Sequence, residues 1–410
     1  MTDLELRPVD RTELPAFYRT LAEVFGEEPE DADRELLAPI FEPERSLAAF
    51  DDGAIVSTAG IYTRDLTVPG GPTPAAGVTF VSVQPTHRRR GLLTAIMRRQ
   101  LTELHDDQQE PVAVLWASEG GIYRRFGYGV AARQLAWEGT KSRLRLRPEV
   151  STGSGRVVLA AAEQARTHEQ AVYEALRPGT AGFLSRPGGW NDRLIADPAH
   201  GRNGASARRH ALHTEQDGSV SGYATYRIKQ DGSSRRNESE VQVQDVFATT
   251  PAAYAALWAF LFGIDLVPKL VRGKAPLDDP LPQLVADPRG LEGFLYDSLW
   301  VRLADVGRAL AARTYTQPVD VVLDVRDEFC PWNARRWRLS GDADGAVCAP
   351  TEDAADLTLS AAELGTVYLG GPTLVALRAA GLVTESTPGA LVAASRAFAG
   401  DRQPWSPEVF

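Results

Sequence analysis

Apolar residues in the first third of the chain recur with the periods of both strands and helices. Runs that alternate or are wholly apolar predict strands, and Asp51-Asp52-Gly53 between two such runs predicts a hairpin. Leu93, Met97, Leu101 and Leu104 fall on one face of a predicted helix. These patterns predict one α/β unit over residues 1–140. Its strands are expected at 4–9, 46–50, 54–62, 78–83 and 112–116, the last as a buried central strand, and its first helix at 14–25 after a capping box of Asp10 and Glu13.

A similar order of elements recurs between residue 156 and about residue 295. The strand expected at 241–247 and the helix expected at 251–262 parallel the strand at 78–83 and the helix after Gly91. The arginines that stand between the earlier pair are missing from the later one. Further elements are expected as a strand near Val157, a helix at 163–176, strands on both sides of Asp217-Gly218 and an exposed loop at 232–236.

From about residue 300 the pattern changes to alternating strands followed by helices. Ser360 and Glu363 form a capping box for a helix that reaches about Tyr368. Spacing alone predicts an α+β domain here. Its strands are expected at 319–325, 337–340 and 356–359, and two further apolar helices at 373–380 and 389–399.

Composition narrows the class of protein. The chain has 410 residues, which predicts two or three domains, and its 43% hydrophobic and 24% charged content is typical of a globular protein. It has no apolar run that could span a membrane, no signal peptide in residues 1–5, and only Cys330 and Cys348 as cysteines, so we expect a cytoplasmic protein. A formal net charge of −10 disfavours nucleic acid and favours cationic ligands. No metal site is expected, because His210 and His213 lack further ligands.

The most specific motif is residues 81–93, VSVQPTHRRRGLL, which predicts a strand, a tight basic loop and a helix start. Pro85 ends the strand, and Gly91 lets the backbone approach a ligand closely. The free N–H groups of the helix start, with three arginines before them, suit a polyphosphate. Acetyl-CoA is the small metabolite that fits best. In an arginine-rich chain, three adjacent arginines can also be a solvated patch.

Residues 88–93 resemble the acyl-CoA loop of the GCN5-related N-acetyltransferases (GNAT), whose pattern is Arg/Gln-x-x-Gly-x-Gly/Ala, and depart from it at Leu93. Together with residues 117–129, ASEGGIYRRFGYG, and a chain that ends in Phe410, they resemble the "enhanced intracellular survival" (Eis) branch of that superfamily. The resemblance implies an α/β fold with tandem GNAT-like domains, each a mixed central sheet flanked by helices, and then an α+β sterol-carrier-like domain. The expected domains are 1–150 (catalytic), 151–297 (a degenerate GNAT-like domain) and 298–410, whose terminus reaches the active site.

The resemblance implies acetyl-CoA as the co-substrate. In this superfamily the strand splays at a bulge, so that backbone groups of residues 81–83 bind the pantetheine arm. Ser118 and Glu119 are expected near the splay, although both also suit an ordinary helix N-terminus. The predicted cofactor-binding residues are Val81, Ser82, Val83, Arg88, Arg89, Arg90, Gly91, Leu92, Leu93, Thr94, Ser118 and Glu119.

Two catalytic residues are expected. Acyl transfer from a thioester expels a thiolate, which a phenol can protonate, and the resemblance implies this role for Tyr123, with Tyr128 as a competitor. In the Eis branch the terminal α-carboxylate takes a proton from the substrate amine, which implies that role for Phe410. The family's acidic residue before the terminal Phe is replaced here by Val409, and Glu408 lies one residue earlier.

We predict an enzyme that transfers acetyl groups directly to primary amines of cationic acceptors, aminoglycosides by resemblance. Protein or peptide lysines and polyamines are alternatives, and a non-catalytic acyl-CoA- or lipid-binding protein is the alternative from another class. The resemblance also implies a homo-oligomer, a hexamer. Aromatic walls and carboxylates suit polycations. The candidate substrate-binding residues are Phe25, Glu27, Glu28, Leu36, Leu37 and Phe80, for each of which packing or solvation is an equal explanation.

Overall fold

The computed structural model describes residues 4–231 and 237–410. The segment expected as an exposed loop, 232–236, lies outside the described residues. The chain divides into two compact units, which are described separately below. Unit 1 contains the described residues up to 132 together with 179–193 and 297–410, and unit 2 contains 133–178 and the described part of 194–296. No helix in the described part of the chain is long and apolar enough to cross a membrane.

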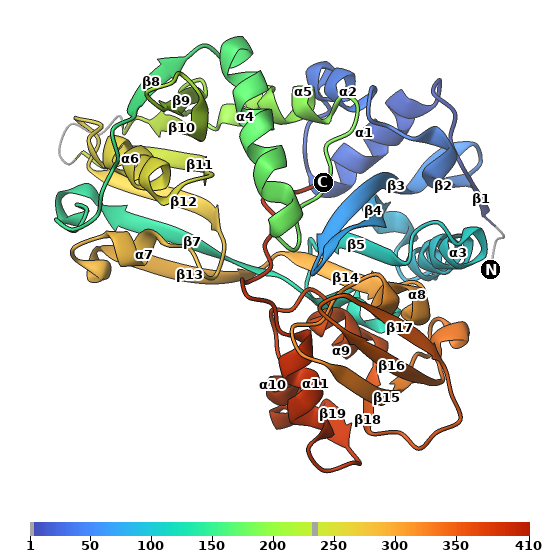
Figure 1. The fold of residues 1–410 in the computed structure, drawn as a ribbon. Helices are drawn as coiled ribbons and strands as arrows, with labels where there is room; N and C mark the ends of the chain where they lie inside the picture. The colour runs from blue at the N-terminus through green and yellow to red at the C-terminus, as the bar shows by residue number, and fades with distance from the viewer. Residues whose placement is uncertain (1–3, 232–236) are drawn as a thin grey trace. The chain divides into compact units, whose positions relative to one another are not determined.

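The first sheet of unit 1 has seven strands in the order β1-β2-β3-β4-β5-β14-β6 (Figure 1). Each strand expected between residues 4 and 116 is present, and β3 and β4 extend beyond the expected bounds because they pair with each other to the turn at Val68–Gly71. The strands are β1 (Glu5–Arg7), β2 (Ser46–Asp51), β3 (Ala54–Val68), β4 (Gly71–Val83), β5 (Val112–Trp116), β6 (Gly129–Val130) and β14 (Leu299–Leu303).

Two long helices cover opposite faces of this sheet. Successive residues of a strand point to opposite faces. On β3, Ile61 packs with Met97 of α3 (Leu92–Asp107), whereas Tyr62 packs with Phe17 of α1 (Leu14–Phe25). The expected capping box before α1 is present, since Asp10 N–H donates to Glu13 Oε2 (3.0 Å) and Glu13 N–H donates to Asp10 Oδ1 (3.2 Å). A short helix that we did not predict, α2 (Asp31–Leu37), follows α1.

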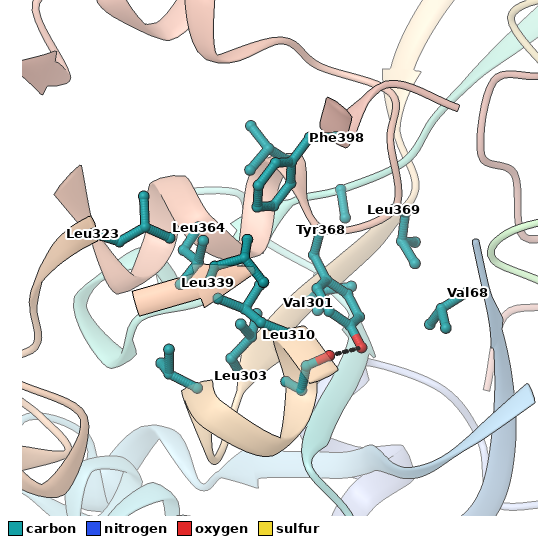
Figure 2. Packing of buried hydrophobic residues seen from close by; sticks show 14 of the residues in the cluster. Val68, Val301, Leu303, Leu310, Leu323, Leu339, Leu364, Tyr368, Leu369 and Phe398 are labelled. Atoms are coloured by element: carbon teal, nitrogen blue, oxygen red, sulfur yellow. Dashed lines mark hydrogen bonds between the residues drawn. The ribbon is translucent and has the colours of Figure 1, made fainter. Parts of the chain in front are cut away.

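The C-terminal part of unit 1 builds a second sheet of five strands, in the order β17-β16-β15-β18-β19. Its core is continuous with that of the first sheet, because Val301 of β14 lies in one buried cluster with Leu323 and Leu364 (Figure 2). The elements are β15 (Val319–Arg326), β16 (Arg336–Asp342), β17 (Gly345–Pro350), β18 (Leu357–Ser360), β19 (Val383–Glu385), α8 (Val306–Ala311), α9 (Ala361–Val367), α10 (Leu374–Ala379) and α11 (Ala390–Phe398).

Unit 2 contains one seven-stranded sheet in the order β13-β7-β12-β11-β10-β9-β8. The strands and helices expected between residues 156 and 262 are present. The elements are β7 (Arg133–Thr140), β8 (Arg156–Ala160), α4 (Ala162–Leu176), β9 (Arg209–Thr214), β10 (Val220–Lys229), β11 (Glu240–Ala248), α6 (Pro251–Phe262), β12 (Lys269–Ala275), α7 (Leu281–Leu284) and β13 (Leu291–Asp297), while α5 (Trp190–Ile195) contains residues of both units.

Two strands lie in a different sheet from the one that we expected. The prediction that residues 1–140 form one unit is wrong at its end, because β7 pairs with β12 of the second sheet. Residues from about 300 were expected to open the third domain, yet β14 lies between β5 and β6 of the first sheet. The apolar pattern of a strand indicates which faces are buried and does not identify its neighbours. The domain boundaries 1–150, 151–297 and 298–410 stay predictions.

Candidate active site

The first sheet opens between β4 and β5. These parallel strands pair only over Ala75–Gly77 and Val112–Val114. Beyond Gly77, the register between β3 and β4 shifts, so that two residues of β4, Phe80 and Val81, face one residue of β3. Such a bulge bends a strand. The expected bulge and splay are therefore present.

Hydrogen bonds from β3 hold the bulge. Phe80 has a φ of 57°, a left-handed conformation that is uncommon for a large side chain. Thr58 Oγ1 donates to the carbonyl oxygen of Phe80 (2.6 Å), and Ser57 Oγ donates to that of Ser82 (2.6 Å). Ser82 Oγ is also hydrogen-bonded to Thr58 Oγ1 (2.6 Å). The carbonyl oxygen and the hydroxyl of Ser82 therefore both bond to β3, and we had not predicted the two β3 hydroxyls.

A cavity of about 910 Å³ occupies this opening, and we refer to it as the β4–β5 cavity. All the predicted cofactor-binding residues except Arg90 line it. The lining residues are Val24, Phe25, Val81, Ser82, Val83, His87, Arg88, Arg89, Gly91, Leu92, Leu93, Thr94, Ser118, Glu119, Ile122, Tyr123 and Arg125.

The three adjacent arginines divide between two environments. Arg88 and Arg89 are exposed and line the β4–β5 cavity. Arg90 instead forms an ion pair with Asp51, whose Oδ2 lies 3.9 Å from Arg90 Nη1. The same oxygen is hydrogen-bonded to His87 Nε2, 2.8 Å away. The left-handed φ of 62° at Arg89 turns the loop between its neighbours.

The N-terminus of α3 faces the cavity. Gly91 precedes the helix with a φ of 86°, which favours glycine, and the first helical hydrogen bond runs from Ala95 N–H to Gly91 O (2.9 Å). The N–H groups of residues 92–94 precede that bond, and all three residues line the cavity. A helix N-terminus beside two guanidinium groups fits the pyrophosphate of acetyl-CoA in both charge and hydrogen-bonding capacity.

Tyr123 forms part of the cavity wall. It precedes the 3-10 turn Arg124–Phe126, and its side chain is buried. Burial, and to a smaller extent the negative charge of Glu119, raises the pKa of Tyr123 to about 12. The phenol is therefore neutral at physiological pH and can act as a proton donor.

Tyr128 lies behind Tyr123, with the two rings at 72° and their centroids 5.9 Å apart. It is fully buried and does not line the cavity. Its hydroxyl has no hydrogen-bond partner within the residues that the structure describes, and burial raises its pKa. Arg302 of β14 packs against Gly127 in the same turn and pairs with Asp327 (2.5 Å). Tyr123 therefore lines the cavity, whereas Tyr128 is buried behind it.

The chain terminus lies on the same sheet. The Phe410 ring packs against Gly77 at the start of the splay, and it also contacts the aromatic cluster that contains Tyr62 and Phe80. Two residues earlier, Glu408 is 3% exposed and forms ion pairs with Arg64 Nη2 (2.8 Å) and Arg186 Nε (2.5 Å). Burial alone would raise the pKa of Glu408, but the two guanidinium groups lower it overall.

The predicted substrate-binding residues do not all lie together. Phe25 lines the β4–β5 cavity and is 49% exposed, and Glu28 is exposed after α1. Leu37 is buried among the residues that pack under α1, and Phe80 contacts the same cluster. Phe80 lies edge-on to Tyr62, with ring centroids 5.3 Å apart. Sequence reasoning missed Arg64, Arg186 and Trp190, because no local signal links distant ion-pair and ring partners.

In unit 2 the corresponding strands are also bulged and splayed. The register shifts in the β10–β11 pair, and β11 pairs with β12 only as far as Val243 and Arg272. Here the buried Arg272 forms an ion pair with Asp279 (2.7 Å). At the start of α6, Thr250 accepts a hydrogen bond from Ala253 N–H, and Pro251 has no N–H to offer.

Family models match three successive regions of the chain. Residues 5–131 and 182–306 each match a model described as an acetyltransferase (GNAT) domain, and residues 306–407 match a sterol carrier protein domain. Two tandem GNAT domains followed by a sterol carrier domain were expected, and this order is confirmed.

Relatives align over almost the whole chain. An uncharacterized N-acetyltransferase of Streptomyces avermitilis is 46% identical over 408 residues, 99% of each chain. N-acetyltransferase Eis of Mycobacterium bovis is 35% identical over 358 residues, which cover 85% of this chain and 84% of the relative. The crystal structure of Eis1 from Mycobacterium abscessus is 35% identical, with a TM-score of 0.84 over 99% of this chain and 100% of that chain. A GCN5-related N-acetyltransferase from Anabaena variabilis, 19% identical, shares the fold with a TM-score of 0.85, over 99% of this chain and 100% of that one.

Proposed function

This chain belongs to the Eis family of GCN5-related N-acetyltransferases, and we propose that it moves an acetyl group directly from acetyl-CoA to primary amines of cationic acceptors. Aminoglycoside-like molecules are the leading class. The observation that supports this proposal is the β4–β5 cavity, which is lined by the start of α3, by Arg88 and Arg89, and by the neutral phenol of Tyr123.

The co-substrate lies along the cavity in this proposal. The pyrophosphate binds the N–H groups of residues 92–94 and the side chains of Arg88 and Arg89, while the pantetheine arm runs beside β4 at Val81 and Val83. Arg90, which is paired with Asp51, acts by positive charge and by holding the loop. Ser118 and Glu119 lie on the β5 side of the opening. The thioester then lies near Tyr123.

The chemistry is a direct acyl transfer. The amine nitrogen attacks the thioester carbonyl, the new C–N bond forms, and the C–S bond breaks after a tetrahedral intermediate. Tyr123 donates its proton to the departing thiolate, and the extra proton on the nitrogen of the tetrahedral intermediate restores the phenol as the amide forms. The α-carboxylate of Phe410 takes a proton from the ammonium form of the acceptor, which gives the neutral amine that attacks.

A covalent acyl-enzyme is disfavoured. Neither Cys330 nor Cys348 is among the residues described as lining the cavity. Burial raises the pKa of the Cys330 thiol, and burial, with a smaller effect of Asp305, raises that of Cys348 to about 12. A protonated thiol is a poor nucleophile.

Aromatic and acidic groups support a cationic acceptor. Phe25 and Glu119 line the cavity, and Phe80 and Phe410 both pack against the neighbouring buried cluster that contains Tyr62. We include Glu28 and Leu37 in the acceptor region, as the sequence chemistry suggested. Lysine side chains of proteins or peptides and polyamines are alternatives with the same chemistry.

The second GNAT domain is degenerate in this proposal. The buried Arg272–Asp279 ion pair lies where β11 and β12 stop pairing, at the position that corresponds to the opening of the first sheet. By resemblance we also propose a cytoplasmic hexamer, which light scattering and cell fractionation test.

A thiol-release assay with acetyl-CoA and kanamycin, spermidine or a lysine peptide tests the function. We expect thiol release that depends on the amine. Retention of coenzyme A without release would instead favour the non-catalytic acyl-CoA-binding or lipid-binding alternative. A tag appended after Phe410 should depress turnover far more than one placed before residue 1. Equal turnover of the two tagged proteins would refute the terminal carboxylate as the base.

A further inference from the structure

The last residues of the chain are anchored through one buried carboxylate. Each oxygen of Glu408 accepts a hydrogen bond from a different arginine, Oε2 from Arg64 Nη2 at 2.8 Å and Oε1 from Arg186 Nε at 2.5 Å. All three side chains are at most 10% exposed. The anchor joins β3, the segment 179–193 and the chain terminus in unit 1.

Arg64 is itself held by further contacts. The Arg64 guanidinium lies over the ring of Trp190, 4.0 Å from its centroid, and its Nε donates to the carbonyl oxygen of Ser185. Its Nη1 is buried and has no hydrogen-bond partner in the described part of the chain. The backbone of the tail is also held three residues before Glu408, because Trp405 N–H donates to the carbonyl oxygen of Ala181 (2.9 Å).

We propose that Glu408 is a positioning residue, which with Arg64 and Arg186 places the Phe410 α-carboxylate for proton transfer and does not itself touch the acceptor. This inference rests on the proposed function. Two residues span at most about 7 Å, so the carboxylate must lie close to the anchored Glu408. The Phe410 ring against Gly77 supplies a second fixed point.

The position of Glu408 argues against direct contact with the acceptor. Its side chain is 3% exposed, and both of its carboxylate oxygens already accept hydrogen bonds from arginines. Val409, in contrast, is 48% exposed. A terminus held at two points loses little further freedom on reaction, which is how distant residues accelerate a chemical step.

The test compares Glu408→Gln with Asp401→Asn in the full-length protein. Both variants remove one negative charge from the same tail, and Asp401 is exposed. Three quantities are measured: release of Phe410 by carboxypeptidase A, kcat/KM for the best amine of the panel, and KM for acetyl-CoA. For Glu408→Gln we expect faster release of Phe410, a loss of about 100-fold in kcat/KM for the amine, and a KM for acetyl-CoA within about twofold of the wild type. Asp401→Asn should match the wild type in all three.

Each combination of results decides the proposal. Unchanged release of Phe410 with lost turnover would mean that Glu408 acts on the acceptor directly, and faster release with unchanged turnover would mean that the terminus is not part of the reaction. Both results overturn the inference, as does no change in either. If Glu408→Gln does not fold, Arg186→Lys keeps the charge, removes the Nε donor and is held to the same expectations. If the wild-type protein releases no thiol with any of the amines tested, the proposed function is overturned. The rate at which carboxypeptidase A releases Phe410 still reports on the anchor in that case.

Discussion

The aromatic ring of Phe410 lies against Gly77, the last residue of β4 that pairs with β5. A Cβ atom on Gly77 would stand 3.3 Å from Phe410 Cε2 and 3.3 Å from the carbonyl oxygen of Tyr62. Only glycine therefore leaves this contact undisturbed. The end of the chain packs at the point where the sheet opens to form the cavity.

Replacing Gly77 by alanine should displace the Phe410 ring. A contact of 3.3 Å is tighter than ordinary van der Waals packing, so the ring must move by a few tenths of an ångström. We expect Gly77→Ala to lower kcat/KM for the amine about tenfold and the free energy of unfolding by about 1 kcal/mol, with KM for acetyl-CoA unchanged. The control is Gly273→Ala, another strand glycine, whose new Cβ would meet no atom within 4 Å. Steady-state kinetics and denaturant unfolding check both, and equal kinetics would exclude a role for the ring contact.

Substitution by phenylalanine should lower kcat at Tyr123 and not at Tyr128. Tyr123→Phe removes the proton donor of the cavity wall, and kcat should fall about 100-fold with little change in KM. Tyr128→Phe removes a buried hydroxyl that has no hydrogen-bond partner among the described residues, so kcat and stability should stay close to those of the wild type. A larger loss of kcat in the Tyr128 variant would reverse the assignment.

The pKa of Tyr123 predicts the alkaline limb of the pH profile. Burial raises this pKa from 10 to about 12, so the phenol stays protonated as the pH rises through 10. The amine acceptor loses its proton over the same range, and kcat should therefore rise and then stay level to pH 10. An unshifted tyrosine would be half ionised at pH 10, and kcat would already decline there. Initial rates at saturating substrates between pH 7 and 10.5 distinguish the two.

The adjacent arginines should differ in their effect on acetyl-CoA. Loss of one charge-assisted hydrogen bond is worth about 1.5–3 kcal/mol, so Arg88→Ala or Arg89→Ala should raise KM for acetyl-CoA about tenfold or more. The effect should shrink at high ionic strength, because both side chains are exposed. Arg90→Ala should change KM by about twofold, since Arg90 is paired with Asp51. Titration of acetyl-CoA at low and high salt measures both, and identical effects of all three would indicate a solvated patch.

Features that depend on neighbours in sequence could be predicted. The capping box of Ser360 and Glu363 forms both of its hydrogen bonds, and Gly91 begins α3 with the left-handed backbone that a glycine there indicates. Helix α6 has the bounds that were expected. In each case residues close in sequence contain the interacting groups, so the local pattern is sufficient.

Features that depend on distant partners could not be predicted. Nothing in the pattern of residues 299–303 says that this strand inserts between β5 and β6. The directions of Arg88 and Arg90 differ because of Asp51, on a strand far earlier in the chain. Likewise, Glu408 was noted only as a departure from the family pattern, since its partners Arg64 and Arg186 carry no signal in sequence.

The place of β14 affects how the protein can be made. Translation delivers β5 and β6 well before β14, the strand that joins them. Until β14 has been synthesised, β5 and β6 have main-chain N–H and C=O groups without their strand partner. Such exposed strand edges can pair with other polypeptides. A protein fragment that ends at residue 150 therefore lacks β14, and its first sheet is incomplete.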